Sequence, residues 1–149
     1  MQRISLVLFL SVAAALGALA ACNKPSTPSP EQAVAVDKVV RDMIGGYTSA
    51  STGNQASAAL EAASTPSFVE SLKAKAKACS AGTAGINCDI DPITCTQAKA
   101  TLTTVVVQAV SATDATATAV VTPEGGAPIN VKVTLAGAPW KVSTVECPR

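Results

Sequence analysis

The first regular pattern in the chain is an apolar stripe with helical spacing. Its members recur every three or four residues: Ala33, Val36, Val40, Met43 or Ile44, and Tyr47. This spacing places them on one side of an α-helix. The run Ser29-Pro30-Glu31-Gln32 predicts where the helix begins, because Ser29 can cap it and Gln32 completes a capping box. We expect the helix to fray or end at Gly45-Gly46.

Two further helices are predicted before the chain becomes irregular. An alanine-rich segment indicates one over about residues 54–63. The next begins at Thr65-Pro66, since threonine caps helices and proline suits their first turn. Phe68, Leu72 and Cys79 then fall on one face of this third helix.

After residue 100 the apolar period changes to alternation, which is typical of β-strands. The expected strands are residues 102–110, 116–122, 129–135 and 140–147. In the last one, Trp140 and Val142 share a face and Val145 falls on the other, which predicts a bulge or a strand covered on both sides. Helices followed by an antiparallel meander predict an α+β fold. We expect three N-terminal helices packed on a curved four-stranded antiparallel sheet, forming a single domain over residues 31–149.

Residues 1–21 have the layout of a secretory signal peptide, with Arg3 followed by an apolar and small-residue run. The run is just long enough to be confused with a membrane-spanning helix. Against a retained span, its last third is nearly all alanine and glycine, and no basic cluster follows it. The stretch Leu19-Ala20-Ala21-Cys22 resembles the bacterial lipobox. The resemblance implies that Cys22 becomes a lipidated N-terminus; the alternative is an ordinary signal peptide in which Cys22 occurs by chance.

A lipidated Cys22 would anchor the protein to a membrane, since two or three acyl chains bind a bilayer almost permanently. Residues 22–30 would then form a Pro/Ser-rich tether. Asn23 follows the cysteine, and similarity to Gram-negative lipoproteins favours sorting to the outer membrane. The expected location is therefore the periplasmic face of the bacterial outer membrane.

The composition excludes several function classes. Loss of residues 1–21 leaves 149 − 21 = 128 residues with 11 − 1 = 10 basic and 10 acidic side chains, so charge gives no case for nucleic-acid binding. The chain has no histidine, the usual general base and commonest metal ligand. No serine, cysteine or lysine is placed as an activated nucleophile. We expect no metal, no cofactor and no enzymatic activity.

Four cysteines remain besides Cys22, namely Cys79, Cys88, Cys95 and Cys147. An even number in an exported chain predicts two disulfides. A zinc site is the alternative, but such sites usually show close Cys-x-x-Cys pairs, which the sequence lacks. Four cysteines allow three pairings. A link between Cys79 and Cys88 closes easily across the flexible segment 81–85, although spacing alone leaves the other pairings open.

Two segments carry a resemblance to a known family, DIDPITCTQ at residues 89–97 and WKVSTVEC at residues 140–147. With the order of helices, irregular segment and strands, they resemble a bacterial envelope family of unknown function, often lipoproteins, with the cone-shaped nuclear transport factor 2-like fold. In that fold the closing strand lies beside the irregular segment. The resemblance therefore implies Cys79–Cys88 with Cys95–Cys147, and the rival pairing is Cys79–Cys95 with Cys88–Cys147.

The irregular segment also contains oxygen ligands at alternate positions, Asn87, Asp89 and Asp91, as the start of a calcium loop does. The calcium pattern then fails, because Pro92 replaces the required glycine and Ala98 replaces the bidentate glutamate. We interpret the segment as a turn held by Asx hydrogen bonds. The candidate loop residues are Asp89, Asp91 and Gln97.

A curved sheet closed by helices would form a concave pocket, and Tyr47, Phe68 and Trp140 are its natural wall residues. The alternative is that these three aromatics fill the core. We expect a membrane-anchored, non-catalytic binding or scaffolding module of the cell envelope, whose partner would be an envelope protein. The alternative function is a small-ligand carrier or hydrolase that uses the cavity.

Overall fold

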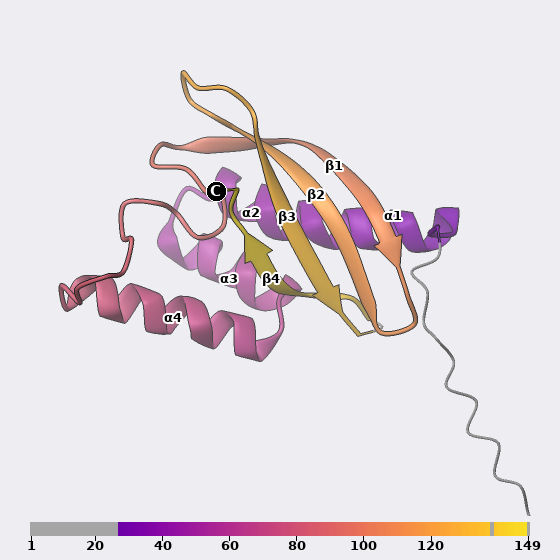
Figure 1. Ribbon diagram of the computed structural model, residues 1–149, viewed down its shortest axis with the longest axis horizontal. Coiled ribbons are helices and arrows are strands. Elements are labelled where there is room, and N and C mark those ends of the chain that lie inside the picture. Colours follow the sequence, from indigo (N-terminus) through magenta and orange to yellow (C-terminus); the bar gives the residue numbers. More distant parts are fainter. Residues whose placement is uncertain (1–26, 138, 149) are drawn as a thin grey trace, which may run out of the picture.

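The computed structural model describes residues 27–137 and 139–148, so the predicted signal peptide and Cys22 lie outside the described residues. Within these residues, none of the helices is long and apolar enough to cross a membrane. The elements are α1 (Pro30–Val40), the π-helical turn η1 (Arg41–Gly45), α2 (Gly46–Ser49), α3 (Gly53–Ala63), α4 (Pro66–Ser80), β1 (Ala100–Val110), β2 (Asp114–Pro123), β3 (Ile129–Ala136) and β4 (Lys141–Glu146) (Figure 1). This order confirms the α+β class and the four-stranded antiparallel sheet.

The first helical stretch begins as predicted but ends later. Ser29 caps α1, and Gln32 completes the capping box. The expected end at Gly45-Gly46 is wrong, because the chain continues through η1 and α2 to Ser49. A Cβ atom at Gly46 would lie 3.0 Å from the Cβ of Ala59. Glycine therefore admits a close approach of α3 at this point instead of ending the helix.

The π-helical turn explains how two adjacent apolar residues become buried together. Met43 and Ile44 both have no exposed surface. A π-helical turn adds a residue to the helical repeat, so it rotates the apolar stripe that begins with Val36 and Val40. The rotation leaves Tyr47 half-buried in α2.

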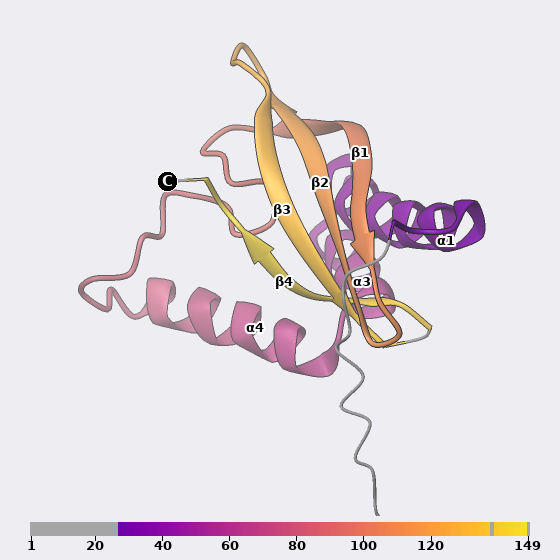
Figure 2. The same cartoon turned by 45° about the vertical axis from the view of Figure 1, so that its right-hand side comes forward.

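The helices pack on one face of the sheet, whose strands follow the order β1-β2-β3-β4 (Figure 2). The inward positions of β2 are mostly alanine, and α1 contacts both β1 and β2. Small side chains here allow the helix to lie close to the sheet. The fully buried inward residues of β3 are Val131, Val133 and Leu135. The core is therefore mainly aliphatic, as the scarcity of aromatic residues requires.

Strand β4 contains the expected irregularity. The pairing of β3 with β4 shifts register after Thr134, which leaves Ser143 as an extra residue on β4. Val142 is fully buried and Val145 is half-buried, so a bulge accounts for their unequal positions. The predicted start at Trp140 is wrong, because the strand begins at Lys141 and Trp140 lies in the preceding turn.

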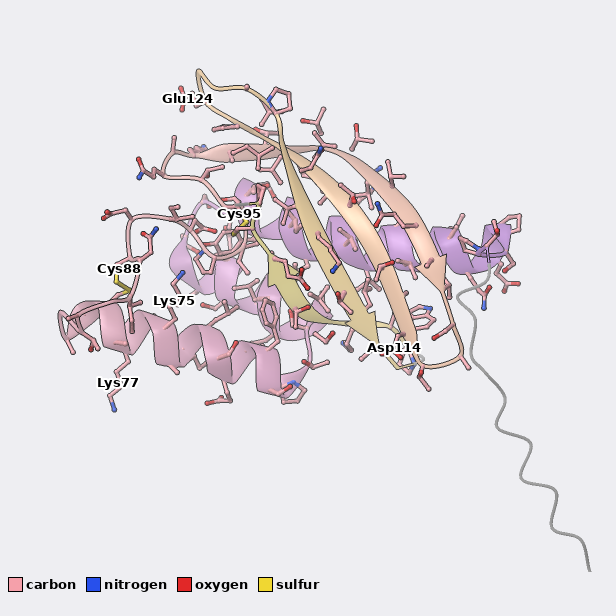
Figure 3. All side chains as sticks on the ribbon, viewed as in Figure 1. Lys75, Lys77, Cys88, Cys95, Asp114 and Glu124 are labelled. Atoms are coloured by element: carbon pink, nitrogen blue, oxygen red, sulfur yellow. A yellow bond between two sulfur atoms is a disulfide. The ribbon has the colours of Figure 1, made fainter. Side chains whose placement is uncertain are left out.

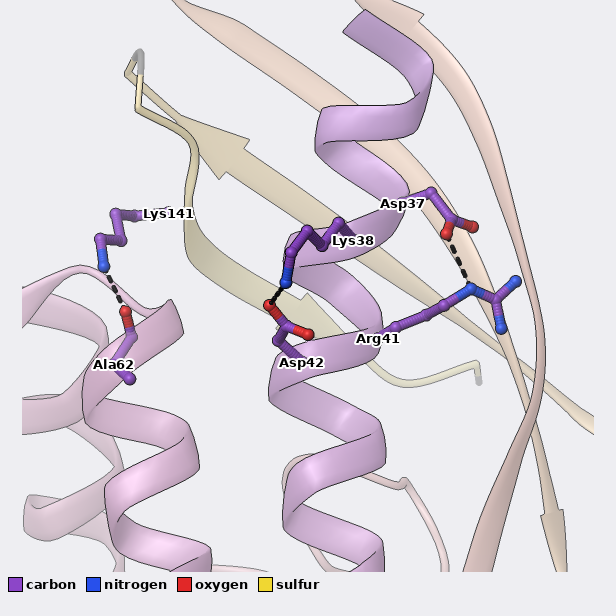
Figure 4. A network of polar contacts seen from close by, with 6 residues as sticks. All are labelled: Asp37, Lys38, Arg41, Asp42, Ala62 and Lys141. Atoms are coloured by element: carbon purple, nitrogen blue, oxygen red, sulfur yellow. Dashed lines mark hydrogen bonds and ion pairs between the residues drawn. The ribbon is translucent and has the colours of Figure 1, made fainter. Parts of the chain in front are cut away.

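The junction between α3 and α4 is fastened to β4. The backbone N–H of Thr65 donates to the carbonyl oxygen of Val142 at 2.8 Å. The Lys141 ammonium donates to the Ala62 carbonyl at the end of α3 (Figure 4). These bonds satisfy backbone groups that a helix end would otherwise leave unpaired. Figure 4 also shows two exposed ion pairs that join α1 to η1, Asp37–Arg41 and Lys38–Asp42.

Candidate functional site

The irregular segment between α4 and β1 is fixed by two disulfides. Cys79 pairs with Cys88, with Cα atoms 5.6 Å apart, and Cys95 pairs with Cys147, with Cα atoms 5.3 Å apart. These are the pairs that the family resemblance implied. One bond ties the segment to the end of α4, and the other ties it to the end of β4 (Figure 3). The segment is therefore held at two points by covalent bonds.

Asx hydrogen bonds organise the segment between the disulfides. Oδ1 of Asp91 accepts hydrogen bonds from the backbone N–H groups of Ile93 and Thr94, both at 2.8 Å. Oδ1 of Asn87 accepts one from the N–H of Asp89 at 3.1 Å. These contacts confirm the interpretation as Asx turns.

The segment then turns sharply around Cys95. Its φ angle is 60°, a left-handed conformation that is strained for a residue other than glycine. The N–H of Cys95 donates to the carbonyl of Asp91 at 2.9 Å, and the N–H of Asp91 donates to the carbonyl of Thr96 at 2.8 Å. The buried hydroxyls of Thr94 and Thr96 lie 2.9 Å apart. These bonds and the disulfide hold the turn in its strained form.

A long-range hydrogen bond joins this segment to α2. The hydroxyl of Tyr47 donates to Oδ2 of Asp91 at 2.5 Å. Burial, this hydrogen bond and the negative charge of Asp91 together raise the pKa of Tyr47 above its ordinary value. Tyr47 is therefore a neutral donor at physiological pH. The Asp91 carboxylate accepts three hydrogen bonds, one from the Tyr47 hydroxyl and two from backbone N–H groups, and acts as a structural acceptor.

An open pocket of about 670 Å³ lies beside this hydrogen bond. One wall comes from residues 47–56, at the end of α2 and the start of α3. The other comes from residues 88–100, in the disulfide-fixed segment. The candidate residues brought together in the lining are Tyr47, Asp89, Asp91 and Gln97.

Two of the three aromatic wall candidates lie elsewhere. Phe68 is buried, with 8% of its surface exposed, and belongs to the hydrophobic core. Trp140 is half-buried and packs against that core. Neither lines the pocket beside Tyr47. The expectation of one aromatic-walled cavity is therefore wrong for Phe68 and Trp140, because a core poor in aromatic residues uses these rings for packing.

Other lining residues were not singled out from the sequence. Thr94, Thr96 and Lys99 contribute to the same wall as Gln97. Their position within four residues of Cys95 does not distinguish them from other loop residues. Burial of the two threonine hydroxyls depends on how the segment folds.

The pocket lining does not form a metal centre. Among the residues that the structure describes, no three His, Cys, Asp or Glu side chains lie close enough together to hold an ion. Asp89 and Asp91 both line the pocket. The Asp91 carboxylate, however, already accepts hydrogen bonds from Tyr47 and two backbone N–H groups. Its arrangement fits a turn-forming role.

Replacing Tyr47 with phenylalanine should lower the free energy of unfolding by about 1.5 kcal/mol, because a hydrogen bond to a charged carboxylate is lost. Denaturant titration of the wild type and the variant would measure this loss of stability. The variant Thr103→Val is the control, because Thr103 makes an exposed hydroxyl–hydroxyl contact with Thr122, and its change should stay within about 0.5 kcal/mol. Equal losses in the two variants would contradict a specific role for Tyr47.

The same variant should change the pH dependence of stability. An unfolded tyrosine ionises near pH 10, whereas folded Tyr47 keeps its proton to higher pH. Above about pH 10 the unfolded state thus binds fewer protons than the folded state, and stability falls as pH rises. Below that pH the contribution of Tyr47 to the free energy of unfolding is fully present. Tyr47→Phe should therefore lose less stability than the wild type between pH 9 and about pH 11, and parallel pH profiles would contradict this.

The described site thus combines a disulfide-fixed loop, a partly buried hydrogen bond and an open polar pocket. No family model, curated protein or solved structure matches the chain.

Proposed function

We propose that this protein is a lipid-anchored module of the bacterial cell envelope that binds a partner and does not catalyse a reaction. The run Leu19-Ala20-Ala21-Cys22 supports the anchor, and Asn23 supports the periplasmic face of the outer membrane. The tether ends where α1 begins, at Pro30. This arrangement would hold the folded domain close to the membrane.

The observation that carries the binding proposal is the fixed pocket between α2 and the irregular segment. Two disulfides and the Tyr47–Asp91 hydrogen bond hold its walls before any ligand arrives. A preorganised site loses less conformational entropy on binding. Tyr47 remains protonated and Asp91 is occupied by structural hydrogen bonds, which favours binding over acid–base chemistry.

The finer fold assignment belongs to the same proposal. We infer a cone of the nuclear transport factor 2-like kind, in which three N-terminal helices close one face of the sheet. Support comes from the chain order of helices, irregular segment and antiparallel meander. The Cys95–Cys147 bond also supports it, since it places the end of the closing strand beside the irregular segment.

A small-ligand carrier is the second candidate function. The pocket volume of about 670 Å³ lies within the range typical of small-molecule sites. The lining is rich in hydroxyl groups and alanine, so this candidate would take a small polar molecule. A hydrolase using the same cavity would need an activated nucleophile and a base.

Site-specific photocrosslinking in intact envelopes would test the binding proposal. A photoreactive residue at Gln97, in the pocket, should capture one envelope component. The same residue at Lys77, on α4 outside the pocket, is the matched control and should not capture it (Figure 3). Equal capture at both positions would contradict the pocket as the binding site. Recovery of one stoichiometric small molecule and no protein would favour the carrier function instead.

A further inference from the structure

The polar groups of the pocket divide into those used by the fold and those left free. Asp91, Thr94 and Thr96 are engaged in hydrogen bonds within the loop. In contrast, the Asp89 carboxylate and the Lys99 ammonium form no hydrogen bond or ion pair with any other described residue. Both residues line the pocket and are exposed. The pocket thus presents one unpaired negative charge and one unpaired positive charge.

The two charges are held on anchored parts of the chain. Asp89 follows the disulfide-bonded Cys88, and its own N–H is bound by Asn87. The carbonyl of Lys99 accepts a hydrogen bond from the N–H of Glu124 at 2.8 Å. Because the two backbones are fixed, the charged groups do not need to be ordered from a flexible loop when a ligand binds.

The charges also do not neutralise each other. No ion pair joins Asp89 to Lys99, so their charged atoms are more than 4.0 Å apart. Gln97 lies in the same wall and offers both a donor and an acceptor. Alanine residues provide small apolar surfaces, and large apolar side chains are absent from the lining apart from the ring of Tyr47. These features match a small polar ligand that carries both charges.

We infer that the pocket recognises a short peptide segment that presents an ammonium group to Asp89 and a carboxylate to Lys99. The inference rests on the proposed binding function and names the chemical class of its ligand. Gln97 would bond the peptide group between the two charges, since an amide side chain can both donate to and accept from it. The hydroxyl-rich and alanine-rich walls would accommodate small side chains.

The test uses the full-length lipidated protein in detergent micelles and the dipeptide alanyl-alanine, which carries both charges. Backbone amide NMR shifts at residues 94–99 should change with a saturable dependence on dipeptide concentration. N-acetylated and C-amidated forms of the dipeptide each lack one charge and should bind at least about threefold more weakly, the size expected for one exposed ion pair. High salt should weaken binding of the uncapped dipeptide.

Variants separate the two charges of the site. Asp89→Asn should weaken binding of the uncapped dipeptide about threefold and should abolish the penalty of N-acetylation. Lys99→Gln should likewise weaken binding of the uncapped dipeptide about threefold, and it should abolish the penalty of C-amidation. The controls Lys77→Gln and Asp114→Asn remove exposed charges outside this pocket and should bind as the wild type does (Figure 3). Amide spectra that change only near the substituted residue would show that each variant is folded.

Three results would overturn the inference: no saturable shifts with the wild type, equal binding of capped and uncapped dipeptides, or equal weakening by the control variants. None of these would overturn the proposed binding function, because photocrosslinking at Gln97 tests it without the dipeptide. The opposite outcome is also distinguishable. If Gln97 captures no envelope component but the dipeptide binds in a charge-dependent way, the envelope partner is rejected and the ligand class is retained.

Discussion

Replacing Cys22 with alanine is expected to release the protein from the membrane to the soluble or inner-membrane fraction. The thiol of Cys22 is the proposed attachment point of a diacylglyceryl group, and alanine cannot form the thioether. Each buried methylene contributes about 0.8 kcal/mol to membrane binding, so two or three acyl chains amount to near-permanent anchoring. Cell fractionation with metabolic labelling by a fatty acid would measure both the location and the lipid.

The double variant Cys79→Ala/Cys88→Ala provides the control for this experiment. It also removes cysteines but leaves Cys22 in place, so it should keep both the acyl label and the membrane location. Wild-type protein that fractionates with the membrane but carries no label would contradict the lipid anchor.

Removing the Cys95–Cys147 disulfide is expected to lower the free energy of unfolding more than removing the Cys79–Cys88 disulfide does. The bond closes a separation of 52 residues, and the chain-entropy model then gives about 4 kcal/mol. Small domains have total stabilities of about 5–15 kcal/mol, so a loss of this size can unfold much of the population. Denaturant titration of Cys95→Ala/Cys147→Ala, which leaves no free thiol from this bond, would measure the change.

The Cys79–Cys88 bond is the internal comparison. It closes a separation of only 9 residues, for which the same model gives about 3 kcal/mol. The variant Cys79→Ala/Cys88→Ala should therefore retain more stability than Cys95→Ala/Cys147→Ala. The reverse order would contradict the longer bond as the main covalent support of the fold.

Much of the fold followed from local patterns. Ser29 and Gln32 form the predicted capping box, because both partners lie within one helical turn. The alternation of Val131, Val133 and Leu135 with polar residues identified β3, since one face of that strand is buried. The unequal faces of Val142 and Val145 indicated the bulge in β4. Each of these signals needs only the residues nearest to it in the chain.

The pocket followed from the sequence only in part. Asp89 and Asp91 were candidates because their oxygen ligands alternate along the chain, and Gln97 because it lies in the segment that resembles the family. All three line the pocket. Their partner Tyr47 lies 44 positions from Asp91. Its hydrogen bond depends on the placement of α2 against the irregular segment, which no local pattern encodes.

The order of helices and strands, the Asx turns and the aliphatic core can be predicted from the sequence alone. These features depend on periodicity, capping and turn chemistry, which act over a few residues. Three other features appear only in the folded structure. The helical stretch continues through Gly45-Gly46, Phe68 and Trp140 pack in or against the core, and Tyr47 donates a hydrogen bond to Asp91. Those outcomes depend on which surfaces meet when distant elements pack, because a close approach at Gly46 or a hydrogen bond at Tyr47 exists only once both partners are in place.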